Sequence, residues 1–303
     1  MTSVPSPVGI EQFGAATASR DPRAIGKVNP AGLWTLYVLT LRQHLHGKRW
    51  IIMLVLFLLP AGFADVVRLT NHRIPGIGIE FMFVFMLIPH AILPLAALIY
   101  VTGIINDEQE EQTITYLLIR PLPKWAIYVI KLLATLTTTV VLTWVFTVLT
   151  YVAIYLGTDS NVSEVTFRCL KAASILSLAV IAYCCLFGLM SLMTKRVLLA
   201  GIVYAIGVEF VVASVPVGIR LVAINYYIRL IAYRSLDFVY AEYGRAENIA
   251  ANAWHFKDDP HLIQHPTTQT CFIVLFTSCV AFTLLAAFIC SRREFHVKTP
   301  EKN

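Results

Sequence analysis

Residues 79–105, IEFMFVFMLIPHAILPLAALIYVTGII, form a long apolar run, and the charged segment 106–124, NDEQEEQTITYLLIRPLPK, follows it directly. A helix needs about 20 apolar residues to cross a bilayer, so the run is long enough to span a membrane. Its apolar residues are continuous and do not alternate with polar ones, which favours a helix over a barrel strand. The run therefore predicts a transmembrane helix, and the segment after it predicts a return of the chain to the membrane surface.

The same pattern recurs along the chain. Of the 303 residues, 57% are hydrophobic and 14% are charged, whereas about 25% of residues are charged in an average soluble domain. Six apolar runs are long enough to cross a membrane, at about residues 50–67, 79–105, 125–156, 170–193, 197–219 and 271–290. The sequence predicts an all-α membrane protein in which residues 31–303 form a single domain with six transmembrane helices.

Basic residues gather at the ends of the runs that would share one side of the membrane. With six crossings, that side holds both termini and the segment 106–124. Its basic residues are Arg42, Lys48, Arg49, Arg120, Lys124, Lys195, Arg196, Arg292 and Arg293. Cytoplasmic loops carry an excess of Lys and Arg, so we expect both termini in the cytoplasm. The net charge of +6 then indicates anchoring to membrane lipid rather than nucleic-acid binding, because no basic module stands apart from the spans.

Three segments outside the runs have their own character. Residues 1–30 are rich in Ser, Ala, Gly and Pro and predict a disordered cytoplasmic tail. Residues 33–49 begin apolar and end basic, which predicts an interfacial helix before the first span; a cytoplasmic extension of that span is the alternative. Residues 220–270 interleave Tyr and Trp with Arg, so we expect helices that dip into the outer interface.

The segment 106–124 has the residue order of a short amphipathic helix. Asp107 followed by Glu110 fits an N-cap with a capping box, and the Leu pair at 117–118 belongs to an apolar face. Pro121 disfavours helix in the residue before it. We expect a helix over residues 107–119 lying along the membrane surface; a solvated hairpin between two spans is the alternative.

The charged segment and the start of the next apolar run resemble those of a known family. The order Glu108-x-Glu110-x-x-Thr113, then Leu117-Leu118, Pro121, Lys124 and Lys131, is similar to the signature of type-2 ABC exporter permeases. Gln112 stands where that family usually has Gly. The six runs, the interfacial helix before them and the long outer segment before the last run match the family's topology.

The resemblance implies a docking role for the charged segment. In that family it forms a cytoplasmic coupling helix in a groove of a separate ABC ATPase subunit, and residues 220–270 correspond to two outer re-entrant helices. The docking residues would be Asp107, Glu108, Glu110, Glu111, Thr113, Leu117, Leu118, Arg120 and Pro121.

The resemblance also implies an assembly of two permeases and two ATPases in a bacterial cytoplasmic membrane. The sequence contains no G-x-x-x-x-G-K-[ST] phosphate loop, and so this chain would not hydrolyse ATP by that route. ATP and Mg²⁺ would bind the partner subunit. We expect neither a cofactor nor a catalytic site in this chain.

Three ionisable residues fall within the runs. Glu209 lies midway along the fifth run, His90 lies midway along the second between two prolines, and Asp65 lies near the outer end of the first. A charge at mid-bilayer costs at least ~2.5–3.5 kcal/mol, so such residues usually face protein or a water-filled cavity. The resemblance places the first, second and fifth spans around the transport pathway, which makes these residues pathway candidates.

Other interpretations of these residues stay open. Glu209 could be neutral and hydrogen-bonded between helices, and His90 could serve packing. A secondary transporter or channel that uses Glu209 and His90 as an ion relay is the alternative function. Cys169 and Cys271 lie near the outer ends of their runs and could pair, whereas no Cys or His spacing predicts a metal site. The sequence does not rank lipids, amphipathic drugs, peptides and small ion-like solutes as substrates.

Overall fold

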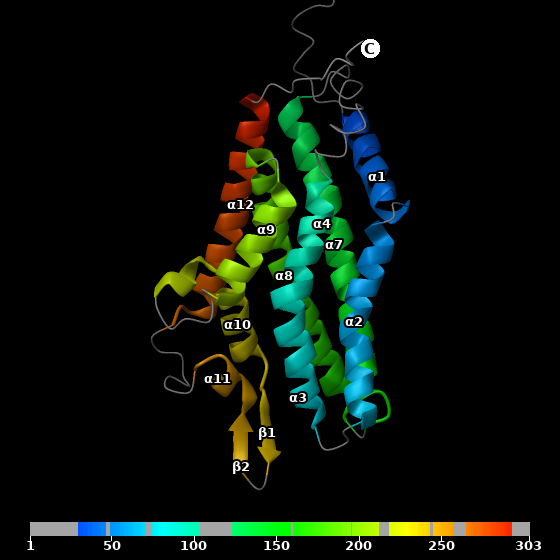
Figure 1. Cartoon of the computed structure of the whole chain (residues 1–303), viewed down its shortest axis with the longest axis vertical. Helices are drawn as coiled ribbons and strands as arrows, with labels where there is room; N and C mark the ends of the chain where they lie inside the picture. The colour runs from blue at the N-terminus through cyan, green and yellow to red at the C-terminus, as the bar shows by residue number, and fades with distance from the viewer. Residues whose placement is uncertain are drawn as a thin grey trace, which may run out of the picture.

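A computed structural model describes residues 30–46, 49–70, 74–103, 123–158, 160–194, 196–211, 218–242, 245–256 and 265–292. These residues form a tall helical bundle with a small hairpin at one end (Figure 1). The tail predicted for residues 1–30, apart from Pro30, lies outside the described residues. The coupling helix predicted for residues 107–119 and every docking residue from Asp107 to Pro121 also lie outside them.

Five segments of the described chain are long and apolar enough to cross a membrane. They are α2 (Arg49–Thr70), the continuous segment Gly76–Thr102, α7 (Lys124–Tyr155), α8 (Val162–Met193) and α12 (Thr268–Arg292). The continuous segment comprises α3 (Gly76–Glu80), the π-helix η2 (Phe81–Ile92) and α4 (Leu93–Thr102). The protein is therefore a multi-pass, all-α membrane protein, as the sequence predicts.

The fifth predicted run, residues 197–219, is described only in part, because residues 212–217 lie outside the described residues. Residues 197–219 were predicted to span the membrane, but the described helix there comprises only α9 (Val197–Tyr204) and the π-helix η3 (Ala205–Val211). The 3₁₀ helix η5 (Gly218–Val222) and α10 (Ile224–Ser235) follow. The carboxylate of Glu209 binds the first backbone amides of α10 and so connects η3 to that helix. The count of six spans remains a prediction.

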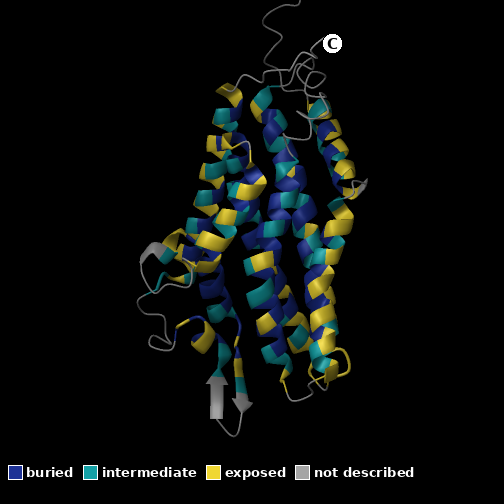
Figure 2. Cartoon of the chain, viewed as in Figure 1, coloured by how far each residue is buried: buried dark blue, intermediate teal, exposed yellow. Residues whose placement is uncertain are grey.

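α8 is the central helix of the bundle. In its most apolar stretch 78% of residues are buried, against 28% in α2 and 11% in α12. Figure 2 shows the same contrast, with exposed residues concentrated on the outer helices. α2 and α12 thus present broad apolar surfaces, as expected of helices that face lipid or another membrane protein.

The N-terminal helix α1 (Pro30–His46) stands upright beside α7 (Figure 1). Leu36, Thr40 and His44 are buried at i, i+4, i+8 spacing, and His44 Nε2 lies 3.1 Å from Thr135 Oγ1 of α7. The location of this helix in the membrane interface stays a prediction. This buried stripe packs on α7 and holds the helix along the bundle.

The segment after α10 forms a small outer unit. β1 (Val239–Glu242) pairs antiparallel with β2 (Arg245–Asn248) with Val239 opposite Asn248, and α11 (Ile249–Ala253) follows. The strands were not expected, because neither Val-Tyr-Ala-Glu nor Arg-Ala-Glu-Asn alternates regularly between apolar and polar residues. α10 accounts for one of the helices predicted within residues 220–270, and its residues from Ile224 to Ala232 are all buried. Predicted re-entry of this segment into the membrane is left untested.

An aromatic cluster fastens the outer unit to η2. The ring centroids of Phe81 and Trp254 lie 5.0 Å apart, and Phe238 lies 5.4 Å from Phe81 and 5.1 Å from Phe85. All four side chains are at most 5% exposed. Aromatic pairs at such distances add about 0.5–1.5 kcal/mol each beyond the burial of their surface.

A buried ion pair closes the same end of the bundle. Glu80 is 0% exposed; it accepts hydrogen bonds from Arg168 Nε at 3.1 Å and Arg168 Nη2 at 3.0 Å. Its oxygens also accept from the hydroxyls of Tyr151 at 2.8 Å and Tyr155 at 2.6 Å. Arg168 Nη1 donates to the backbone oxygen of Asp237 at 2.9 Å. One carboxylate therefore links α3, α7 and α8, and its arginine extends the link to the outer unit.

We predict that Arg168→Leu destabilises the fold by about 2–3 kcal/mol. Breaking a fully buried ion pair costs about 3–5 kcal/mol, and the Arg168 side chain retains 12% exposure. The measurement is the thermal unfolding midpoint of the purified protein in detergent. Lys171→Leu is the control, since Lys171 donates at this end to the backbone oxygen of Ser235 rather than to a carboxylate. Equal midpoints for the two variants would contradict a central role for the ion pair.

Candidate functional site

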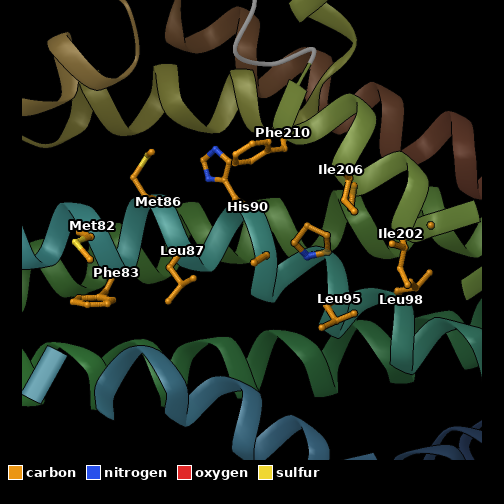
Figure 3. A pocket seen from close by; sticks show the side chains of 14 residues that line it. Met82, Phe83, Met86, Leu87, His90, Leu95, Leu98, Ile202, Ile206 and Phe210 are labelled. Carbon is orange, nitrogen blue, oxygen red and sulfur yellow. The ribbon is translucent and has the colours of Figure 1, made fainter. Parts of the chain in front are cut away.

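An apolar groove of about 670 Å³ runs between η2–α4 and α9–η3 (Figure 3). One wall belongs to the second apolar segment, and the other to the described part of the fifth. The lining is apolar except for His90. It consists of Met82, Phe83, Met86, Leu87, His90, Ala91, Pro94, Leu95, Leu98, Gly201, Ile202, Ala205, Ile206 and Phe210.

Both walls of the groove contain π-helix. η2 is 12 residues long and η3 is 7 residues long, whereas π-helix usually appears as single turns inside α-helices, frequently at functional sites. Pro89 lies inside η2, where proline removes a backbone donor and clashes with the α-helical pattern. The two irregular segments face each other and carry two of the three ionisable residues predicted to line the pathway, His90 on η2 and Glu209 on η3.

His90 connects the groove to α10. Its ring lies at the groove, with a ring centroid 6.3 Å from that of Phe210, and Figure 3 shows the two side chains next to each other. On its other side, His90 Nε2 is in contact with Arg229 Nη2 of α10. The apolar groove thus has one polar point, and a buried arginine stands behind it.

Glu209 is 0% exposed and receives four donors. Its Oε1 accepts from Tyr204 OH at 2.7 Å and from the backbone N–H of Ile224 at 3.0 Å. Its Oε2 accepts from Tyr183 OH at 3.0 Å and from the backbone N–H of Asn225 at 2.8 Å. The two backbone N–H groups begin α10, and anions are favoured at a helix N-terminus. Glu209 therefore caps α10 and ties it to α8 and α9.

α10 presents two further polar side chains on the same face. Asn225 and Arg229 are four residues apart, which places them one above the other on a helix. Asn225 is 0% exposed and Arg229 is 7% exposed. Among the described residues, neither the side-chain oxygen nor the side-chain nitrogen of Asn225 has a hydrogen-bond partner.

The three predicted pathway residues divide into two groups. His90 and Glu209 both meet α10, His90 through Arg229 and Glu209 through the amides of the first turn. Asp65 is exposed on α2 and does not line the groove. The four donors on Glu209 agree with the packing role that the sequence analysis left open. An ion-relay role for Glu209 and His90 remains untested.

Several residues of the cluster around Glu209 and α10 were not predicted from the sequence. Arg229 and Asn225 lie in a segment that was interpreted as interfacial, and Tyr183 and Tyr204 look like ordinary aromatic residues in apolar runs. Of the buried charged residues that were not predicted, only Glu80, which pairs with Arg168, could have been identified from the sequence, because it is an acidic residue at the start of the second apolar run. The partners of these charges come from distant positions, which a single sequence does not indicate.

Within the described ranges, no group of three or more His, Cys, Asp and Glu side chains is placed to hold a metal ion. Cys169 and Cys271, whose pairing the sequence left open, are free thiols. His265 lies 2.9 Å from Tyr226 OH through its Nδ1.

The long apolar helices define a helical membrane protein, and a groove between two of its helical segments is a feature expected of a permease. A family model described as "ABC-2 family transporter protein" matches residues 44–213, more than half of the 303 residues. The chain therefore belongs to the ABC-2 family and is an ABC transporter permease, a class that associates with an ABC ATPase. No curated protein matches the chain. The matched residues include both walls of the groove, whereas α10 with Asn225 and Arg229 lies beyond them.

We predict that Glu209→Gln loosens the start of α10. The side-chain NH₂ of the amide would point at hydroxyl and backbone N–H groups that are themselves donors. A hydrogen bond to a charged group contributes about 1.5–3 kcal/mol. Hydrogen exchange at the Ile224 and Asn225 amides should become roughly tenfold faster or more.

The measurement is hydrogen–deuterium exchange of the detergent-purified protein. Glu164→Gln is the matched control, because Glu164 is exposed in the first turn of α8. Unchanged exchange at both amides would show that the carboxylate does not cap α10.

Proposed function

We propose that the protein is the transmembrane subunit of an ATP-driven exporter. In this proposal a separate ABC ATPase binds and hydrolyses ATP with Mg²⁺, and this chain moves the substrate without catalysing a reaction itself. The complex would contain two ATPases and two copies of this permease, and would lie in a bacterial cytoplasmic membrane with both termini in the cytoplasm.

The family match is the observation that carries the proposal. It includes the acidic segment 106–124, which connects α4 to α7. The beginning of α1 and the end of α12 lie at the same end of the bundle, where α7 begins (Figure 1). An ATPase docked on the connecting segment would therefore stand at the end of the bundle from which both chain termini extend.

The groove supports a transport role because its walls continue from that segment. α4 forms part of one wall and leads directly toward residues 106–124. α9 approaches α4 closely, since a Cβ added to Gly201 would lie 2.3 Å from Leu98 Cδ1. Movement of α4 would consequently press on α9 and change the groove between them.

The proposed mechanism is a shift between two conformations of the permease pair. ATP binding would close the ATPase pair, move the coupling segment and tilt α4 and α7 on either side of it. ATP can drive this shift only by binding one conformation more tightly than the other. The apolar surfaces of α2 and α12 offer room for a second copy and for membrane lipid.

We predict that the double variant Glu108→Lys, Glu111→Lys abolishes association with the ATPase. Reversal of two charges in the acidic segment would oppose binding to an ATPase groove that accepts negative charge. The measurement is co-purification with an ABC ATPase encoded in a neighbouring reading frame, together with ATP turnover. Glu164→Lys is the control, being an exposed charge reversal in the first turn of α8. Retained association and turnover in the double variant would refute the docking role.

The alternative, a secondary transporter or channel with a Glu209–His90 relay, makes a different prediction. A relay would let protons cross liposomes that hold the permease alone, and Glu209→Gln would stop them. We expect no such flux, because both Glu209 oxygens are occupied by four donors. A pH-sensitive dye inside the liposomes provides the measurement, and flux removed by Glu209→Gln would favour the relay.

A further inference from the structure

The buried polar face of α10 has no explanation in the coupling mechanism. Arg229 stands behind the single polar point of the groove, and Asn225 lies one turn away with an unpartnered, fully buried amide. Buried polar groups are almost always hydrogen-bonded, so an exception calls for a cause. These residues lie outside the part of the chain that matches the family.

We propose that the groove and this face of α10 bind an elongated anionic amphiphile from the bilayer, a lipid with an acyl chain and a phosphate headgroup. The apolar chain would lie between η2–α4 and α9–η3, and the headgroup would lie at His90, Arg229 and Asn225. As the transported substrate class this rests on the proposed function, whereas the binding itself does not.

The shape of the groove suits a chain molecule. Its lining extends along one wall from Met82 to Leu98, which is at most roughly 24 Å at the α-helical rise of about 1.5 Å per residue, since the π-helix η2 rises less per residue. That length is most of the ~30 Å hydrocarbon thickness of a bilayer. A long apolar groove along the bundle can shelter an acyl chain, and its single polar residue excludes a sugar or another solute that needs many hydrogen bonds.

The charge at the groove suits an anionic headgroup. Arg presents a planar fork of donors that matches phosphate oxygens, and the Asn225 amide adds a donor on the same face of α10. Glu209, the acid at the start of α10, already has two donors on each oxygen. The four donors offset part of the negative charge of Glu209, and the Asn225 amide is left without a partner among the described residues.

The position of these donors matches the hardest point of transport. His90 lies midway along the second span, between Pro89 and Pro94. A charged headgroup is least stable near the centre of the hydrocarbon region. Donors placed there would lower the cost of its passage.

The test uses the full-length permease in liposomes, without any ATPase. The probes are photoactivatable phosphatidic acid and, for comparison, photoactivatable phosphatidylcholine. We expect phosphatidic acid to label peptides of η2–α4 and α9–η3, and unlabelled phosphatidic acid to compete at least about tenfold better than phosphatidylcholine. Equal labelling and competition by the two lipids would overturn the proposal, because it would indicate unspecific contact with the bilayer.

Two variants separate the chain site from the headgroup site. Ile206→Trp fills the groove and should remove most labelling, whereas Val141→Trp, on the exposed surface of α7, should leave it unchanged. Asn225→Leu removes the unpartnered amide and should reduce the preference for phosphatidic acid about tenfold without lowering thermal stability. An unchanged preference in Asn225→Leu would overturn the headgroup assignment.

A second copy of the chain is the competing occupant of the groove. If it fills the groove, Ile206→Cys would cross-link between copies and lipid labelling would be absent, which would overturn the proposal. Because these measurements need no ATPase, they are independent of the docking test with Glu108 and Glu111. If the docking test fails, the lipid-labelling test can still be interpreted, and the reverse also holds.

Discussion

The buried carboxylate of Glu209 accepts hydrogen bonds from three helices and so fixes how these helices are arranged beside the groove. Glu209 takes one hydroxyl from α8, one from α9 and two backbone amides from the first turn of α10. An ionised group away from water is tolerated only when its oxygens are fully bonded. The helices that supply these donors are consequently held around it.

The same arrangement recurs at the outer end of the bundle. Glu80 binds Arg168 of α8 and two hydroxyls of α7, so α8 provides a partner for each buried acid. Helices in a membrane gain little from hydrophobic association, because lipid is as apolar as their side chains. Packing and buried hydrogen bonds therefore determine how they assemble, which explains why the most buried helix also carries the key polar partners.

The groove is a consequence of how these acids position the irregular helices. η3 ends in the Glu209 cluster, while η2 begins directly after Glu80 and carries His90 toward Arg229. The two π-helical segments face each other across an apolar space that neither fills. A transporter needs such a space, and it needs walls that can move without breaking the bundle. The close approach of Gly201 to Leu98 gives those walls a point of contact.

The sequence by itself determined the class of protein, the positions of five long apolar helices and the family. It could do so because the length of an apolar run and a local motif are properties of neighbouring residues. It identified Glu209, His90 and Asp65 as ionisable residues within apolar runs, and the structure buries Glu209 and leaves Asp65 exposed on α2. Only the tertiary structure decided that α1 packs along α7, that Glu209 caps α10, and that His90 of the groove contacts Arg229. Those features depend on contacts between residues far apart in the chain, where a buried charge finds its partners on other helices.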